Sequence, residues 1–399
     1  MKVKKLVRSL LADRRGHAEQ LPKSPIDWLT HPLARFFKIE ALAGLVLLFF
    51  TLLALYLANS SWSSQYTALW QVQIGIQFGA FSIEHTLHDW INDGVMSLFF
   101  FLIALELKRE LVWGELHTPK LAMLAVSAAF GGMVVPACVY LAFQNGESGQ
   151  HGWGTVMATD TAFVIGCLAL LGKRIPRSMR VFMLSLAIVD DIGAILVIAI
   201  GYSNGIEPFY VGASLIVVAL VKIMSSLGIR SIFLFFVVGV LLWFFIGAAG
   251  IHPTVAGIML GLMTPTTRWV SEARLHDIVH FLLTAPLSDS EADEQAHSQS
   301  IKTAELAARE ALSPVERLEH MLHPWVGFVV MPLFAFANAG IPLAVDGMLG
   351  AITMAVFFGF VVGKPAGVFL FSWAALTQAV FLNLPFRLST SAFCVRLSG

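Results

Sequence analysis

The sequence has little charge. Only 13% of its 399 residues are Asp, Glu, Lys or Arg, about half the share found in an ordinary globular domain, and the formal net charge is zero. It lacks the basic surface on which nucleic-acid binding depends, so we expect no nucleic-acid partner. Its three cysteines have no metal-like spacing and are interpreted as small apolar residues. Any chemistry must therefore come from the few polar residues inside apolar segments.

Hydrophobic residues, by contrast, make up 57% of the chain and fall in long runs. About 20 apolar residues suffice for a helix to cross a bilayer, and helices satisfy their own backbone hydrogen bonds in lipid. We therefore predict an all-α, multi-pass membrane protein whose transmembrane domain covers residues 36–376. The ten predicted spans are residues 40–58, 88–107, 120–143, 154–172, 181–201, 208–227, 231–249, 251–266, 324–343 and 348–376.

Lysine and arginine lie on one side of these spans. Cytoplasmic loops carry the excess of positive charge in membrane proteins, so residues 1–35 are predicted to form a cytoplasmic arm, and they lack the features of a signal peptide. The same rule leaves one cation, Lys364, inside the tenth span. The segments predicted to be outside contain no Lys or Arg: residues 59–87, 144–153, 202–207, around 250, and 344–347.

Two hydrophilic segments have features of their own. In the outer loop, within residues 66–85, apolar and polar residues alternate from Trp70 to Phe78, which predicts a half-buried strand. Its exposed edge either pairs with a second copy in a homodimer or closes on its own loop as a hairpin. The cytoplasmic loop 267–322 is predicted to be solvated, with a short helix near residues 301–312.

Charged groups inside the apolar spans are the candidate functional residues, because a charge in the membrane is costly and marks a site by default. They are Asp160 beside Thr159, the adjacent pair Asp190 and Asp191, and Lys364. The structural alternative is that they are salt-bridged charges that only join helices. Adjacent positions on a helix differ in direction by about 100°, so one of the paired aspartates is free to face Lys364 while the other faces a cavity with Asp160.

These residue types suit a hard cation such as Na⁺, which prefers oxygen ligands. Carboxylates crowded in a low dielectric also hold protons more readily, so one site would bind either a cation or protons. Pro365 removes a backbone donor next to Lys364, and Thr159 and its neighbours weaken the middle of the fourth span. Broken helices at the midplane are typical ion sites of secondary transporters.

A second polar set lies at the predicted inner ends of the second and ninth spans. It is either a set of ordinary interfacial charges or a pH-responsive cluster, because histidine titrates near neutrality. At the outer ends, Asn92 and Asp93 are candidates for lining an entrance, and His252 is interpreted as a capping or interface residue rather than a ligand. The members of the inner set are Glu106, Arg109, Glu110, Glu319, His320 and His323.

The chain resembles the NhaA-type bacterial sodium/proton antiporters in a series of motifs that follow the family order over about residues 30–376. That family is itself a standard example of inverted repeats with broken helices. The matching motifs are LELKREL (105–111), ATDTAF (158–163), LAIVDDIGAI (186–195), LEHMLHPW (318–325), FAFANAG (334–340) and GKPAG (363–367).

The resemblance implies a function and a set of roles. Asp191 would be the main cation ligand with Asp190 beside it, and Lys364 would pair with Asp190 when the cation is absent. Thr159 and Asp160 would belong to the interrupted fourth helix, the inner set would sense pH, and residues 66–85 would form a dimer hairpin. The family expels Na⁺ or Li⁺ from the bacterial cytoplasm across the inner membrane by drawing in protons, moves net charge and needs no cofactor.

The family has twelve helices, and this sequence supplies about ten. Residues 377–399 contain Pro385, Arg387 and Arg396 and no apolar run of 18 residues, so we expect the last two spans to be missing. Two alternatives to an antiporter follow. One is a truncated homologue that does not transport; the other is an intramembrane aspartyl protease, in which Asp160 and Asp190 would activate water, although that chemistry gives Lys364 no role.

Overall fold

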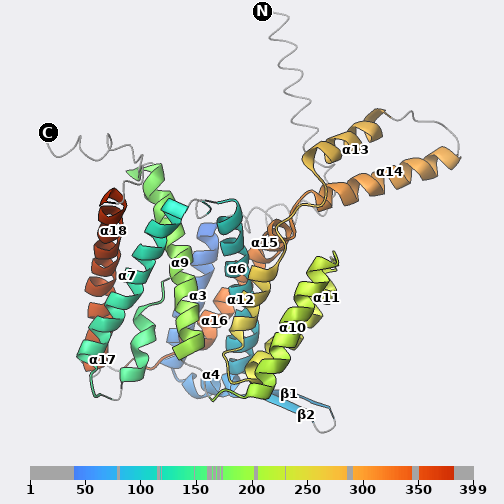
Figure 1. Ribbon diagram of the computed structural model, residues 1–399. Coiled ribbons are helices and arrows are strands. Elements are labelled where there is room, and N and C mark those ends of the chain that lie inside the picture. The colour runs from blue at the N-terminus through green and yellow to red at the C-terminus, as the bar shows by residue number, and fades with distance from the viewer. Residues whose placement is uncertain are drawn as a thin grey trace, which may run out of the picture.

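Most of the apolar runs form helices, which lie side by side between two ends of the molecule (Figure 1). The computed structural model describes residues 40–78, 81–114, 117, 119–147, 149–159, 164, 168, 171, 174–201, 205–229, 231–284, 291–343 and 350–381. Of the predicted segments, the arm 1–35, Asp160 and nearly all of residues 377–399 lie outside this part.

The first half of the described chain holds one hairpin among its helices. Its elements are α3 (Glu40–Ala58), α4 (Ser63–Trp70), β1 (Gln73–Phe78), β2 (Phe81–Thr86), α5 (Leu87–Asp89), the π-helical turn η1 (Trp90–Val95), α6 (Met96–Val112), α7 (Pro119–Phe143), the 3-10 helix η3 (Gln150–Val156) and α9 (Arg177–Gly201).

In the second half, all regular elements among the described residues are helices. Its elements are α10 (Pro208–Ser226), α11 (Ile232–Ala248), α12 (Thr254–Met263), α13 (Glu272–Thr284), α14 (Glu291–Glu310), α15 (Pro314–Trp325), the π-helical turn η5 (Val326–Val330), α16 (Met331–Asn338), α17 (Ala351–Phe358), the π-helical turn η7 (Gly359–Gly363) and α18 (Lys364–Phe381).

Several of these helices are long and apolar enough to cross a membrane. In the described part of the chain there are five, or six when α3 and α4, which bend by 117°, count as one span. Apolar side chains such as Phe209 and Phe233 are exposed on the outside of the bundle, as lipid contact requires. The protein is thus an all-α, multi-pass membrane protein, and the total of ten spans stays a prediction. The five are Leu87–Val112, Ala122–Phe143, Pro208–Ser226, Pro314–Asn338 and Ala351–Thr377.

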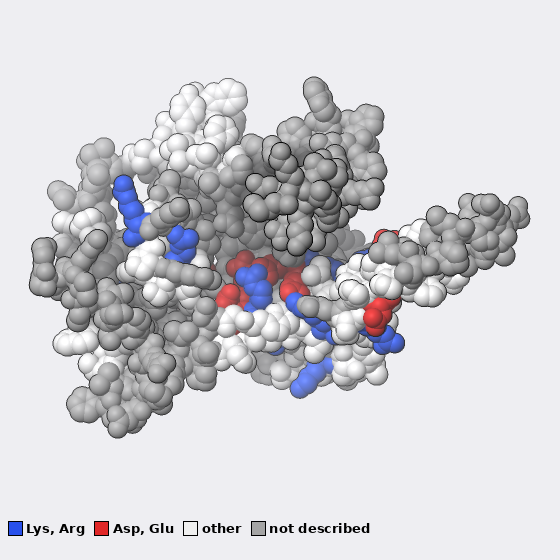
Figure 2. Space-filling model, turned by 90° about the horizontal axis from the view of Figure 1, so that it is seen from above, with Lys and Arg blue, Asp and Glu red and all other residues white. Residues whose placement is uncertain are grey.

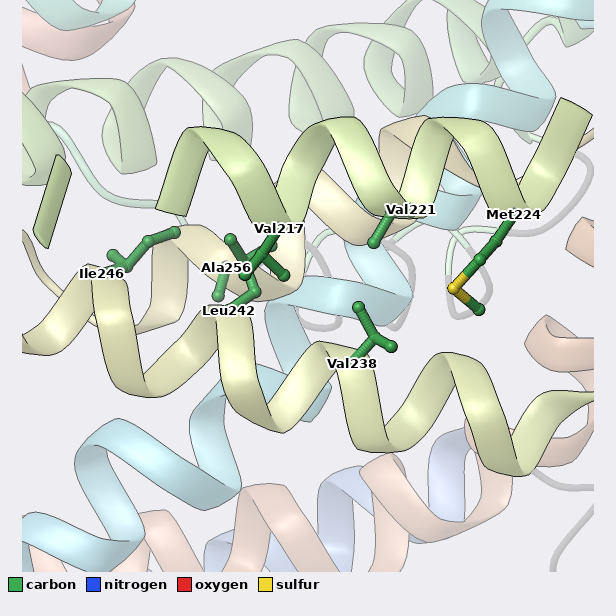
Figure 3. Close-up of a cluster of buried hydrophobic side chains, with 7 residues drawn as sticks. All are labelled: Val217, Val221, Met224, Val238, Leu242, Ile246 and Ala256. Carbon is green, nitrogen blue, oxygen red and sulfur yellow. The ribbon is translucent and has the colours of Figure 1, made fainter. Parts of the chain in front are cut away.

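The helices pack by two different means. Between α10, α11 and α12, branched apolar side chains interdigitate (Figure 3). Between α7 and the η7–α18 segment, glycines bring the backbones themselves together: a Cβ on Gly363 would lie 2.9 Å from Cα of Pro136, and one on Gly367 would collide with the carbonyl oxygen of Gly131. Small residues at helix contacts are the usual way to pack helices closely in membranes. The second contact therefore fixes the backbone next to Lys364.

The predicted outer loop contains a strand where its alternating residues predict one, but the predicted half-burial is wrong at Ile74, which is 45% exposed. β1 pairs antiparallel with β2, with Gln73 opposite Thr86 and Phe78 opposite Phe81. The pairing is a local hairpin, at the end of the bundle opposite α13 and α14 (Figure 1). Thr86 and Asp89 form a capping box that starts the next helix directly after the hairpin.

The loop 267–322, predicted to be cytoplasmic, is more ordered than expected, because α13 and α14 form two helices that contact each other and project from the bundle (Figure 1). The prediction of one short helix near residues 301–312 was wrong in extent. The sequence of α14 is largely polar and shows no apolar stripe that would predict a long helix. Its buried residue Ala307 has little hydrophobic surface. At the base, Arg317 binds Glu310 at 3.0 Å, and the capping box of Ser313 and Glu316 starts α15.

Candidate functional site

A buried ion pair lies in the interior of the bundle. Asp190, in the middle of α9, is 3% exposed, and its Oδ2 lies 2.8 Å from Nζ of Lys364, the first residue of α18. The Thr159 hydroxyl donates a hydrogen bond to the same oxygen. The lysine also donates to the carbonyl oxygen of Met157 at 2.6 Å. The chain following η3 therefore meets α9 and α18 at one carboxylate oxygen.

Burial makes this pair sensitive to the loss of either member. The side chains of Lys364 and Asp190 are 16% and 4% exposed, so neither charge is well solvated, and each depends on the other for compensation. The second oxygen of Asp190, Oδ1, is buried and has no hydrogen-bond partner among the described residues. That oxygen retains its capacity to accept a proton or to bind a cation.

The other predicted site residues lie close by in the sequence, but the structure does not describe all of them. Asp191 follows Asp190 on α9 and is partly buried; its direction from the helix axis differs by about 100°. Asp160 lies outside the described residues. Residues 157–159 are not helical, so the predicted fourth span begins with the short 3-10 helix η3 and a non-helical segment rather than a continuous α-helix.

This arrangement places competing charges at one oxygen. The Lys364 ammonium and a bound cation would both be drawn to Oδ2 of Asp190, and Thr159 adds a hydroxyl oxygen suited to hard cations. A cation that binds here must displace the ammonium or share the carboxylate with it. Occupancy of the site by a cation would therefore be coupled to the position of the Lys364 ammonium.

The inner set of charged residues gathers at the end of the bundle that carries α13 and α14. Figure 2 shows acidic and basic side chains side by side near the centre of this face. Arg109 binds Glu319 and lies 3.7 Å from Glu110, so the structure brings together residues that flank the second and ninth predicted spans. Glu106 is partly buried, and His320 and His323 are exposed on α15.

A polar cluster that the sequence hinted at only in part lies at the hairpin end. The side-chain amide nitrogen of Asn338 donates a hydrogen bond to Oδ1 of Asn92 at 2.8 Å. The side-chain oxygen of Asn338, Oδ1, lies 3.1 Å from Nε2 of His88. His252 is 3.0 Å from the Thr254 hydroxyl and 3.9 Å from the carboxylate of Asp93. Asn92 and Asn338 are 246 residues apart in the chain, so no local pattern indicates their contact.

The Met157 carbonyl is the site group that the sequence concealed. It binds Lys364 through its backbone, and a backbone acceptor leaves no mark on residue type. The signal was indirect: polar Thr159, two residues later, indicated a break in the helix, and a broken helix exposes carbonyl oxygens.

Comparisons with known proteins agree with the motifs. The profile of the family described as Na+/H+ antiporter 1 matches residues 34–395. The chain is 55% identical over 357 residues to Na(+)/H(+) antiporter NhaA 2 of Vibrio vulnificus, covering 90% of this chain and 80% of that protein. It is 52% identical to Na(+)/H(+) antiporter NhaA of Rhizobium meliloti, covering 90% and 82%, and 50% identical to NhaA 2 of Acidiphilium cryptum, covering 94% and 84%.

Proposed function

We propose that this chain, which belongs to the Na+/H+ antiporter 1 family, exchanges Na⁺ or Li⁺ for protons across the bacterial inner membrane. Membership of that family makes it a transporter rather than an enzyme, which removes the aspartyl-protease alternative. The observation that carries the proposal is the buried pair of Asp190 and Lys364, with Thr159 on the same oxygen. The transported ions are its substrates, and the exchange requires no cofactor.

The proposed cycle follows from competition at the carboxylates. Asp191 is the main ligand of the cation, assisted by Asp190, Thr159 and Asp160. When the site opens to the outside, protons displace the cation; when it opens to the cytoplasm, the cation displaces protons. Lys364 binds Asp190 in the cation-free state and releases it on loading.

Net charge moves if both aspartates titrate. Two protons would then enter for each cation that leaves, and the membrane potential would drive the exchange. Because the two carboxylates are adjacent, their protons would be lost in two steps that belong to the pair rather than to either residue.

Two further parts of the molecule have proposed roles. The inner cluster around Arg109 and Glu319, with His320 and His323 exposed beside it, senses cytoplasmic pH, because histidines change charge near neutrality. The hairpin β1–β2 offers strand edges for pairing with a second copy, so we propose a homodimer through residues 66–85. The N-terminus lies in the cytoplasm, by the distribution of Lys and Arg.

The decisive experiment measures proton flux in inside-out vesicles that contain the chain of 399 residues. A dye that reports the pH gradient should dequench when Na⁺ is added to wild type, and the Asp191→Asn variant should show no dequenching. The control is Asp277→Asn, the same substitution at an exposed position of α13, which should behave as wild type.

Both alternatives are open to this measurement. Exchange by wild type excludes the non-transporting homologue. Na⁺-driven proton movement that persists in Asp191→Asn would refute the role assigned to that carboxylate. Absence of exchange in correctly inserted wild type would refute the antiport function of this chain.

A further inference from the structure

Three π-helical turns interrupt the helices in the part of the chain that the structure describes: η1, η5 and η7. A π turn closes its hydrogen bond one residue later than an α turn, and such turns are frequent at functional sites. The last of them, η7, ends at Gly363, immediately before Lys364. The extra residue therefore lies directly upstream of the lysine of the buried ion pair.

Two of the turns are followed by a proline at the same offset. Pro332 lies two residues after the end of η5, and Pro365 lies two residues after the end of η7. Proline lacks the N–H that would bond the carbonyl four residues earlier, and its ring clashes with that carbonyl. In both cases that carbonyl belongs to the middle residue of the π turn, Phe328 or Val361. In membrane helices local π adjustments relieve such a clash.

The turn η1 has a different cause, since no proline lies within residues 90–97. Here the carbonyl oxygen of Asp93 accepts hydrogen bonds from the Ser97 hydroxyl and, at 2.9 Å, from the indole of Trp243. In η1 the Trp243 indole of α11 thus binds the carbonyl oxygen that, in the other two turns, is left without its α-helical partner by proline. Proline at this offset is therefore one way to form a π turn, but it is not sufficient, because Pro136 and Pro324 lie inside α7 and α15 with ordinary α-helix before them.

The backbone on both sides of Lys364 is held against α7. Gly359 and Gly363 are buried, Gly363 contacts Pro136, and Gly367 contacts Gly131. With its neighbours fixed, the direction in which Lys364 leaves the helix is set by the number of residues in the turn before it. Loss of the π turn would change that direction by about 100°, the angle of one residue on an α-helix.

We propose that Pro365 is a positioning residue, which maintains the π turn η7 so that the ammonium of Lys364 reaches Asp190. The inference rests on the proposed function, because it assigns a purpose to that ion pair. Pro365 itself bonds neither partner: Lys364 binds Asp190 at 2.8 Å and Met157 at 2.6 Å. Its effect passes through the backbone that joins it to the lysine.

The test is a double-mutant cycle on the thermal unfolding of the purified full chain. Pro365→Ala is measured in wild type and in Lys364→Met, where no ion pair exists. If Pro365 positions the lysine, Pro365→Ala will lower the unfolding temperature of wild type by several degrees more than it lowers that of Lys364→Met. Shifts that agree within about 2 °C, the range expected for independent sites, would overturn the proposal.

The chain offers a matched control in Pro332, which follows η5 at the same offset and is fully buried. Pro332→Ala makes the same change in backbone chemistry away from Lys364. Its effect should be the same in wild type and in Lys364→Met. Suppose that the effects of Pro332→Ala and Pro365→Ala depend equally on whether Lys364 is present. The cycle would then measure general disruption of the helices, and the proposal would also be overturned.

A rescue variant tests the direction of the lysine. Pro365→Ala combined with removal of Val361 leaves an α-helix without the extra residue, which returns Lys364 to its original direction. Lys364→Met should then again lower the midpoint by as much as it does in wild type. If Lys364→Met has no effect in that background, the explanation by helix direction is wrong.

These outcomes are separate from those of the flux experiment. The cycle measures the ion pair in the folded protein and requires no transport. A chain that shows coupling of Pro365 to Lys364 but no Na⁺-dependent proton flux would support the positioning role and refute antiport. Na⁺-dependent proton flux without coupling of Pro365 to Lys364 would support antiport and refute the positioning role.

Discussion

The interior and the inner end of the bundle both hold ion pairs, but in very different surroundings. Lys364 and Asp190 are 16% and 4% exposed, with 2.8 Å between their charged atoms. Arg268 and Glu316, at the base of α13 and α15, are 40% and 20% exposed at 3.0 Å. Distance alone does not distinguish the pairs. Exposure to solvent distinguishes them. Water can replace a lost partner of Arg268 or Glu316, whereas it has little access to Lys364 and Asp190.

The largest predicted effect is the difference between breaking these two pairs. Lys364→Met leaves a buried carboxylate without its partner and should cost about 3–5 kcal/mol of stability. Arg268→Met, which also loses the contact of the guanidinium with Trp113, should cost about 1 kcal/mol. Denaturation of both variants in the same detergent measures the contrast. Equal losses would show that burial does not govern the interior pair.

A smaller effect is predicted for the glycine contact that holds the interior pair in place. Gly363→Ala puts a methyl group 2.9 Å from Cα of Pro136, and since backbone cannot move aside cheaply, the variant should lose about 1–3 kcal/mol. Gly212→Ala on α10 is the control, because its Cβ meets nothing within 4 Å and alanine favours a helix by up to about 1 kcal/mol. A stabilising Gly363→Ala would contradict the close packing of α7 on α18.

Gly363→Ala also sharpens the comparison. It should weaken the coupling between Lys364 and Asp190, measured by a double-mutant cycle, and leave the pair of Arg268 and Glu316 unchanged. Loss of coupling at both pairs would indicate a general loosening of the bundle.

The sequence predicts the interior ion pair, the hairpin strand and part of the charged cluster. Charges isolated in apolar runs marked Asp190 and Lys364, because such charges need partners, and the structure pairs them directly. Alternating residues predicted the strand β1, although its apolar residue Ile74 is exposed, so the alternation did not mark a buried face. The inner cluster also follows from the sequence in part, as Arg109 and Glu319 occur at the predicted inner ends of two spans.

The remainder depends on contacts that residue types do not reveal. The Met157 carbonyl binds Lys364 through the backbone, and the amide pair of Asn92 and Asn338 joins residues far apart in the chain. The helix α14 was concealed by its polar surface. Pro365 indicated a bend near Lys364, but residue types alone do not show that the backbone adjusts by the π turn η7 rather than by a kink.

The central claim is that one site holds either a cation or protons, and Na⁺ affinity as a function of pH tests it most directly. The apparent affinity of the purified chain for Na⁺, read from the Na⁺-dependent rise in its thermal midpoint, should weaken as the pH falls. The expected change is roughly tenfold per pH unit for each proton that competes, and Asp191→Asn should show no Na⁺-dependent rise. A Na⁺ affinity that does not change with pH in wild type would contradict the shared site.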